Sequence, residues 1–180
     1  MEHELEHEQM KQQTREGTLG EIFLRAARFN TGDAKRIQHL TKVHSFARSI
    51  ALSEGLPDDE LFTLEVAALL HDIGIKPAEK QYGRCDGKLQ ERLGPPVARK
   101  LLEGLTLSES CVERVCFLIG HHHTYDSIDS ADWRILVEAD FLVNLFEDGA
   151  SDEAIQNAYR TVFCTASGKA LCRVMFALQE

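Results

Sequence analysis

Positive charge is in short supply in this chain. It carries 20 Lys and Arg against 29 Asp and Glu, which gives a formal net charge of −9. Affinity for nucleic acids and for anionic membranes comes from clustered Lys and Arg, so we expect neither as a partner. The acidic balance does not exclude an anionic substrate, provided that its pocket is locally positive or holds a metal ion.

Long apolar runs and paired cysteine motifs are also missing. No stretch approaches the roughly 18 apolar residues that a membrane span needs, and the polar N-terminal residues contain no apolar segment typical of a secretion signal. The five cysteines are odd in number and form no CxxC, which favours reduced thiols over disulfides. We therefore expect a cytoplasmic protein.

Alternating strand patterns and internal repeats are absent, whereas apolar residues recur at helical spacing throughout residues 18–180. With 43% hydrophobic residues, 180 residues suffice for one domain. We predict an all-α fold, a compact single-domain helical bundle of about seven or eight helices. Residues 1–17 are expected to form a flexible arm, and residues 75–88 a polar loop. The helical segments are 18–29, 34–55, 59–74, 97–105, 114–120, 131–149, 151–164 and 167–179.

Polar residues interrupt three of these apolar helices. His39 lies at the edge of the apolar stripe of the second segment, between Ile37 and Val43. In the sequence AALLHDIGIK, His71 and Asp72 end the third segment, and Asp140 interrupts the apolar sequence ILVEADFLVNL. Three separate helices therefore each bring a polar side chain toward the interior.

Such placement has a physical cost, and a divalent cation removes it. A buried carboxylate costs several kcal/mol unless it is paired or bound to a cation, and two inward carboxylates also repel each other. Taken alone, a histidine such as His39 is more often a hydrogen-bonded core histidine than a metal ligand, and Asp140 is also explained as a buried hydrogen-bond acceptor or an ion-pair partner. A cation accepts neutral imidazoles and ionised carboxylates together, and helical bundles commonly build metal sites from facing helices.

The set H…HD…D resembles the HD-domain superfamily of metal-dependent phosphohydrolases. The resemblance rests on RIQHLTKVHSFA for the first histidine, AALLHDIG for the doublet and VEADFLVN for the last aspartate. It implies an HD-type helical fold with one divalent metal held by His39, His71, Asp72 and Asp140. It also implies hydrolysis of a phosphoester or phosphoanhydride of a small molecule, with nucleotides among the candidates. A mixed nitrogen and oxygen ligand set suits Mn, Fe, Co, Ni or Zn better than Mg.

Basic side chains near the doublet are candidates for holding the substrate phosphate. Lys76 follows Asp72 by four residues, and Arg36 precedes His39 by one helical turn. Similar proteins often carry a lysine directly after HDIG, whereas Ile75 intervenes here. We assign catalytic roles to Asp72 and Lys76, and substrate binding to Arg36 and Lys76; the simpler alternative for both cations is a solvated surface charge.

Three consecutive histidines, His121, His122 and His123, follow a predicted helix and are candidates for the same pocket. An imidazole there could serve as a general acid, bind phosphate or ligate a second metal. We assign the catalytic role to His122, substrate binding to His121 and His123, and a weaker second metal site to His121 and His122. An exposed loop is the plainer alternative. Related proteins with two metals have a histidine where this chain has Gln90, so we expect one metal per chain.

Two other functions remain open at this stage. One is a di-iron oxygenase of the HD type, which needs the complete histidine set that Gln90 interrupts. The other is a non-catalytic module that binds a nucleotide, although such a module has no need of all four ligands. The substrate and the oligomeric state do not follow from the sequence.

Overall fold

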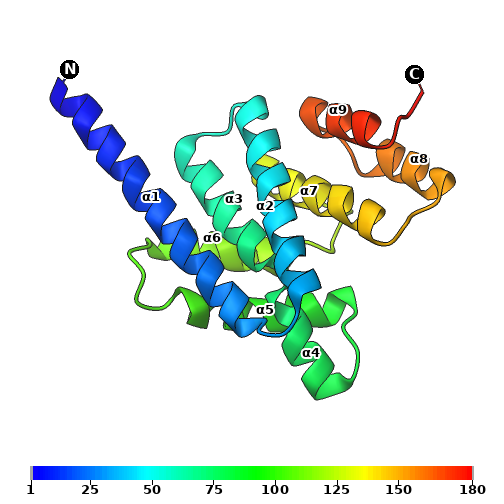
Figure 1. Cartoon of the computed structure of the whole chain (residues 1–180), viewed down its shortest axis with the longest axis horizontal. Coiled ribbons are helices and arrows are strands. Elements are labelled where there is room, and N and C mark those ends of the chain that lie inside the picture. The colour runs from blue at the N-terminus through cyan, green and yellow to red at the C-terminus, as the bar shows by residue number, and fades with distance from the viewer. Residues whose placement is uncertain (1, 180) are drawn as a thin grey trace.

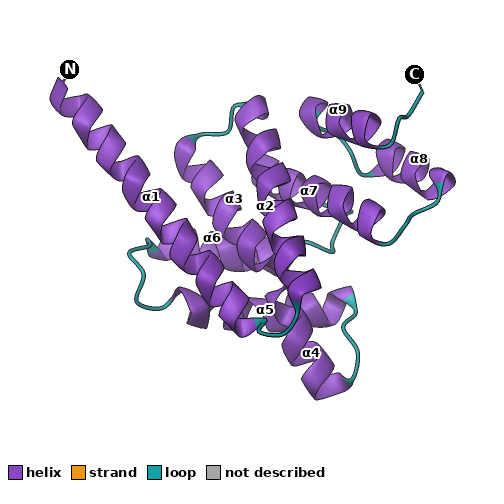
Figure 2. Cartoon of the chain, viewed as in Figure 1, coloured by secondary structure: helices purple, strands orange, loops and turns teal. Residues whose placement is uncertain are grey.

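The computed structural model describes the backbone of residues 2–179 and the side chains of residues 12–179. Within that range the chain forms nine α-helices, one 3₁₀ helix and no strand (Figure 2). The predicted all-α class is confirmed. The elements are α1 (Glu2–Phe29), α2 (Ala34–Glu54), α3 (Asp58–Leu70), η1 (His71–Gly74), α4 (Ile75–Tyr82), α5 (Gly87–Leu102), α6 (Glu109–Ile119), α7 (Ala131–Glu147), α8 (Asp152–Thr161) and α9 (Ala166–Met175).

The centre of the fold is formed by α2, which packs against α3 on one side and α7 on the other. Helix α6 packs against α3, and α5 packs against both α6 and η1 (Figure 1). The facing sides of these helices contribute completely buried residues such as Leu64, Leu70, Ile119 and Leu136 to one core. This burial, rather than helix propensity, supplies most of the stability of short helices.

Helix α1 is longer than the sequence predicts. Its backbone is helical from Glu2, and its N-terminal half extends away from the rest of the chain (Figure 1). Residues 2–16 contain five Glu and three Gln, which are good helix formers. The side chains of residues 1–11 lie outside the described part, and flexibility of the arm stays a prediction.

The helix that carries the HD doublet ends earlier than expected. Helix α3 ends at Leu70, the residues HDIG form the 3₁₀ helix η1, and α4 follows at once where a loop was expected. Gly74 is the last residue of η1 but leads directly into α4 rather than into a loop, and its φ of −74° is accessible to any residue. A Cβ there would lie 2.6 Å from the Gln90 carbonyl oxygen and 2.9 Å from the Gly94 nitrogen. Glycine is needed because two backbones meet at this point.

Helix α5 also begins earlier than the prolines suggest. Its N-cap is Asp86, whose side chain accepts a hydrogen bond from the Leu89 amide, and the helix continues through Pro95 and Pro96. The sequence predicts a helix only after these prolines, because each removes one intrahelical hydrogen bond. Packing of α5 on α6 and η1 compensates for that loss.

All five cysteines are free in the structure. No described helix combines the length and the apolar character required to cross a bilayer.

Candidate metal centre

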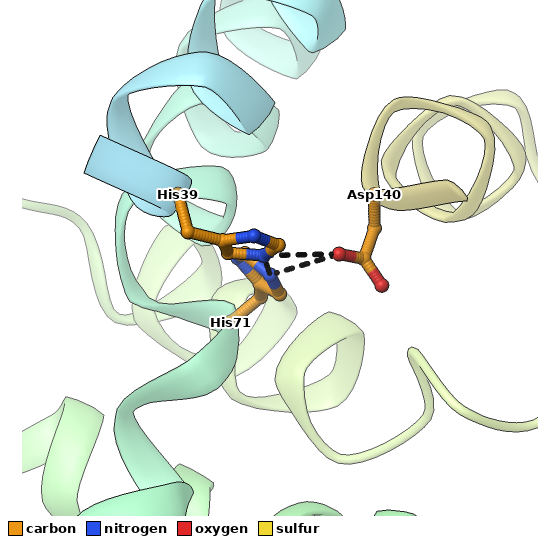
Figure 3. Close-up of side chains that lie close together, drawn as sticks. All are labelled: His39, His71 and Asp140. Atoms are coloured by element: carbon orange, nitrogen blue, oxygen red, sulfur yellow. Dashed lines mark hydrogen bonds and ion pairs between the residues drawn. The ribbon is translucent and has the colours of Figure 1, made fainter. Parts of the chain in front are cut away.

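Three elements bring the predicted metal ligands together. His39 comes from the first third of α2, His71 and Asp72 from η1, and Asp140 from the middle of α7. Figure 3 shows the side chains of His39 and His71 side by side, with Asp140 facing both from α7. His39, His71 and Asp140 are buried, and Asp72 is largely buried with 13% of its side chain exposed.

The distances within this group are short. His39 Nε2 lies 3.2 Å from His71 Nε2 and 3.2 Å from Asp140 Oδ1, and His71 Nε2 lies 3.4 Å from the same oxygen. The nearest Asp72 oxygens lie 3.4 Å from His39 Nε2 and 3.6 Å from His71 Nε2. The structure thus brings His39, His71 and Asp140 into one group that could hold a metal ion, and it groups Asp72, which borders both histidines, with His122 and His123.

The hydrogen bond at Nδ1 of each neutral imidazole determines whether its Nε2 atom carries a proton. His71 Nδ1 lies 2.9 Å from the Ala68 carbonyl oxygen, which can only accept, so Nδ1 carries the proton. His39 Nδ1 lies 3.3 Å from a carboxylate oxygen of Glu147 and donates in the same way. When both rings are neutral, their Nε2 atoms therefore present lone pairs to each other and to Asp140.

Two imidazole nitrogens and two carboxylates this close to one another require a positive charge among them, either a proton or a metal ion. Burial opposes charge on His71, yet Asp72 and Asp140 outweigh it and raise the pKa of His71 to about 9. The pKa values of Asp72 and Asp140 are lowered despite burial, because His71 stabilises the first carboxylate and hydrogen bonds from His39 and His71 the second. A divalent cation meets the same demand with both imidazoles neutral, so the donor set fits a transition metal.

His122 extends the cluster. Its Nδ1 donates to the Ile119 carbonyl oxygen at 2.7 Å, and its Nε2 is buried without a hydrogen-bond partner among the described residues. That Nε2 lies 3.6 Å from Asp72 Oδ1, and the ring stands edge-on to His71. An orphaned buried nitrogen beside a carboxylate is explained by a metal, water or substrate at this position.

His123 lies beside His122, with one ligand atom within 4.8 Å of both His122 and Asp72. Its Nε2 faces the side-chain oxygen of Gln90 at 3.1 Å, and its Nδ1 faces the Tyr125 hydroxyl at 3.2 Å. The Gln90 amide nitrogen donates to the Cys85 carbonyl, so the Gln90 oxygen accepts from His123. Burial, followed by the neighbouring His122, lowers the pKa of His123 to about 4 and keeps it neutral.

His121 is not brought to the cluster. Its ring stacks on Phe117 with centroids 4.2 Å apart, and its Nδ1 donates to the Phe117 carbonyl oxygen at 2.7 Å. Its own carbonyl accepts from the Trp133 indole. The residue that joins His122 beside Asp72 is therefore His123, whereas the sequence predicts His121 for the second site.

Lys76 and Arg36, the predicted phosphate-binding residues, are engaged elsewhere. The Lys76 amine donates to the Phe29 carbonyl oxygen at 2.7 Å, and Arg36 forms ion pairs with Asp33 and Glu79. Both side chains thus fasten the start of α2 and α4 to neighbouring elements. Their binding of substrate stays a prediction.

Two residues that support the cluster escape sequence reasoning. Asn144 donates from its side chain to Asp140 Oδ1 at 2.8 Å, and Glu147 accepts from His39. They follow Asp140 by four and seven residues and so share its helix face. The sequence contains this spacing, but it indicates a supporting role only after Asp140 is known to lie in the cluster.

A larger hollow lies elsewhere and shares no residue with the cluster. This cavity of about 870 Å³ is bordered by α1 and the starts of α3, α6 and α7, including Arg15, Phe62 and Arg114. Both arginines in it are already paired with aspartates. The convergence of side chains that could hold a metal ion, rather than cavity size, therefore identifies the candidate site.

Comparison with known proteins agrees with this geometry. The HD domain family matches residues 36–158, which include all four predicted ligands. The crystal structure of a predicted HD superfamily hydrolase from an uncultured Thermotogales bacterium superposes with a TM-score of 0.63. The two sequences are 26% identical over 87% of this chain and 84% of that one. Among curated proteins none matches. On the extent of the family match, the chain belongs to the HD domain family.

Proposed function

We propose that this protein is a metal-dependent phosphohydrolase that cleaves a phosphoester or phosphoanhydride of a small molecule. One observation carries the proposal. Carboxylate oxygens of Asp72 and Asp140 lie within 3.6 Å of the Nε2 atoms of both His39 and His71, and the two Nε2 atoms lie 3.2 Å apart. Family membership and the structural similarity to an HD superfamily hydrolase support it.

The four residues would hold one divalent transition metal. When bound, such an ion would lower the pKa of a coordinated water and offset negative charge on a phosphate group. The backbone carbonyl of Ala68 and the carboxylate of Glu147 keep the His71 and His39 rings oriented for this role.

His122 is the residue best placed to move a proton. Its Nδ1 is fixed by the Ile119 carbonyl, so only Nε2 is free, and that atom is buried beside Asp72. An unprotonated Nε2 in this position would accept a proton from an attacking water, and the imidazolium formed in this way would pass that proton to the leaving group. Asp72, with its partly exposed carboxylate, lies between His122 and the other ligands.

A small phosphorylated molecule, such as a nucleotide, is the proposed substrate. Its negative charge would be met chiefly at the metal, because Lys76 and Arg36 have other partners. Binding of substrate by Lys76 requires release of its amine from the Phe29 carbonyl. His123 and Tyr125 border the other side of the cluster.

One metal per chain is proposed rather than two. His123 forms a second possible metal-holding group with Asp72 and His122, but its Nε2 already contacts Gln90 and its Nδ1 contacts Tyr125, so ligation by His123 would require the loss of one of these contacts. This arrangement disfavours the di-iron oxygenase, which needs two irons per chain.

Elemental analysis of freshly purified protein, combined with a screen of nucleotides and phosphomonoesters under Mn, Fe, Co, Ni and Zn, tests the proposal. We expect about one metal per chain and phosphate release from at least one substrate class. Asp140→Asn, which keeps the side-chain shape but removes the charge, should lose both. The exposed Asp129→Asn should keep both.

Three outcomes would contradict the proposal. Two irons per chain with oxygen-dependent turnover would favour the oxygenase. Nucleotide binding without turnover or metal would favour the non-catalytic module. Phosphate release that survives in Asp140→Asn would show that hydrolysis takes place elsewhere.

A further inference from the structure

Glu147 occupies an unusual position for a carboxylate. It is the last residue of α7, where the helix dipole places partial negative charge, so a glutamate there is locally unfavourable. Its side chain is nevertheless only 10% exposed. Burying an acid at the wrong end of a helix calls for a compensating role.

The contacts of Glu147 indicate that role. One carboxylate oxygen lies 3.3 Å from His39 Nδ1, and the other lies 2.5 Å from the Lys42 amine. Lys42 follows His39 by three residues, so both partners lie on the same face of α2. The positive charge of Lys42 offsets the repulsion between the Glu147 carboxylate and the end of α7. Lys42 also holds one carboxylate oxygen of Glu147, so that the other oxygen stays in contact with His39 Nδ1.

The hydrogen bond at Nδ1 determines which nitrogen of His39 faces the cluster. A neutral imidazole carries its proton on either nitrogen, and only the Nδ1-protonated form leaves Nε2 free to ligate. At His71 and His122 a backbone carbonyl fixes this choice. At His39 a side chain does so, and a side chain can be replaced without altering the ligand.

We propose that Glu147 is a positioning residue that holds His39 in the Nδ1-protonated form and thereby sets the metal affinity of the cluster. This inference rests on the proposed metal-dependent function. Carboxylate–histidine–metal arrangements of this kind raise the basicity of the ligating nitrogen, and their loss weakens metal binding by about 10–100-fold. Nothing in the geometry requires Glu147 to touch metal or substrate.

Metal affinity and the tautomer of His39 are the two measurements that test the inference. Competition with a chromophoric chelator gives the Kd for Zn²⁺ or Mn²⁺, and ¹⁵N NMR of the imidazole in metal-free protein reports which nitrogen carries the proton. For Glu147→Ala we expect about a 10–100-fold higher Kd and a mixture of tautomers. Glu147→Gln keeps an acceptor oxygen and should recover part of both effects.

The exposed Glu153→Gln on α8 serves as the matched control and should behave as the unmodified protein. Thermal unfolding in the metal-free state shows whether each variant folds. If the unmodified protein binds no metal, the proposed function fails before Glu147 is tested. If it binds metal and Glu147→Ala folds with an unchanged Kd and an unchanged tautomer, the inference about Glu147 is overturned.

Discussion

His39 Nε2 and His71 Nε2 lie 3.2 Å apart, although α2 and η1 place the two residues 32 positions from each other in the sequence. In hydrogen-bonded cores a histidine nitrogen faces a group of opposite character. Here the Nδ1 atom of each ring donates to a separate acceptor, so the two Nε2 atoms face each other with lone pairs unless one ring gains a second proton. The contact is favourable only when a positive charge lies between the rings and the carboxylates.

A metal that fills this position should stabilise the fold. Binding to the native state alone contributes about 2.7 kcal/mol when the free metal is 100 times the Kd. For a chain of this size that is a rise in Tm of roughly 5–10 °C. Differential scanning fluorimetry of chelator-treated protein with added Mn²⁺, Co²⁺ or Zn²⁺ measures it. A Tm that no divalent metal shifts would contradict the metal centre.

His122 should matter for turnover more than for metal binding. Its Nε2 is free and borders the cluster beside Asp72, in the position of a proton carrier. We expect His122→Asn to lower kcat by about 10²–10⁴-fold, the usual contribution of general acid–base catalysis. Its metal content should stay close to that of the unmodified protein. Equal loss of metal in His122→Asn and His71→Asn would instead make His122 a ligand.

Gly74→Ala should destabilise the protein although glycine is normally the poorer helix residue. The added Cβ would lie 2.6 Å from a backbone oxygen and 2.9 Å from a backbone nitrogen of α5, neither of which can rotate away. We expect a loss of about 1–3 kcal/mol in the free energy of unfolding, measured by urea denaturation.

Gly20→Ala provides a control of opposite sign for that substitution. Gly20 lies within α1, and a Cβ there meets no atom within 4 Å. Alanine should therefore raise stability by about 0.5–1 kcal/mol. Similar effects of the two substitutions would contradict the close approach of η1 and α5.

Glu65 should make stability depend on pH in the acid range. Burial opposes its ionisation, but hydrogen bonds from His44 and Arg48 outweigh it and lower its pKa. Because the pKa is lowered on folding, ionised Glu65 stabilises the fold fully above its unfolded-state pKa of about 4.3. This stabilisation is lost as the pH falls through the folded-state pKa. Glu65→Gln should therefore cost about 1.5–3 kcal/mol at pH 7 and much less near pH 3.

Urea denaturation of Glu65→Gln at both pH values measures that difference. As a control, Glu60→Gln at an exposed position should show no difference between the two pH values in its effect on the free energy of unfolding. A cost for Glu65→Gln that is the same at both pH values would mean that packing, rather than charge, gives Glu65 its importance.

Much of the candidate ligand set could be anticipated from the sequence, because it depends on local pattern. Helical periodicity places His39 and Asp140 toward the core, and the doublet interrupts an otherwise apolar segment. The supporting residues could not be found in this way. Asn144 and Glu147 are ordinary polar residues on an amphipathic helix until their distances to Asp140 and His39 are known.

By itself, the sequence determined the all-helical class and the four polar residues that converge in the core, since both follow from periodicity and from the cost of buried charge. Tertiary structure decided which of the three consecutive histidines faces the cluster. Neighbouring residues in a turn point in different directions, and the path of the chain after α6 directs His122 inward and His121 onto Phe117. It also decided that Gly74 lies against the backbone of α5 and that the Lys76 amine donates to Phe29 at the end of α1. Both contacts depend on elements that are distant in the sequence.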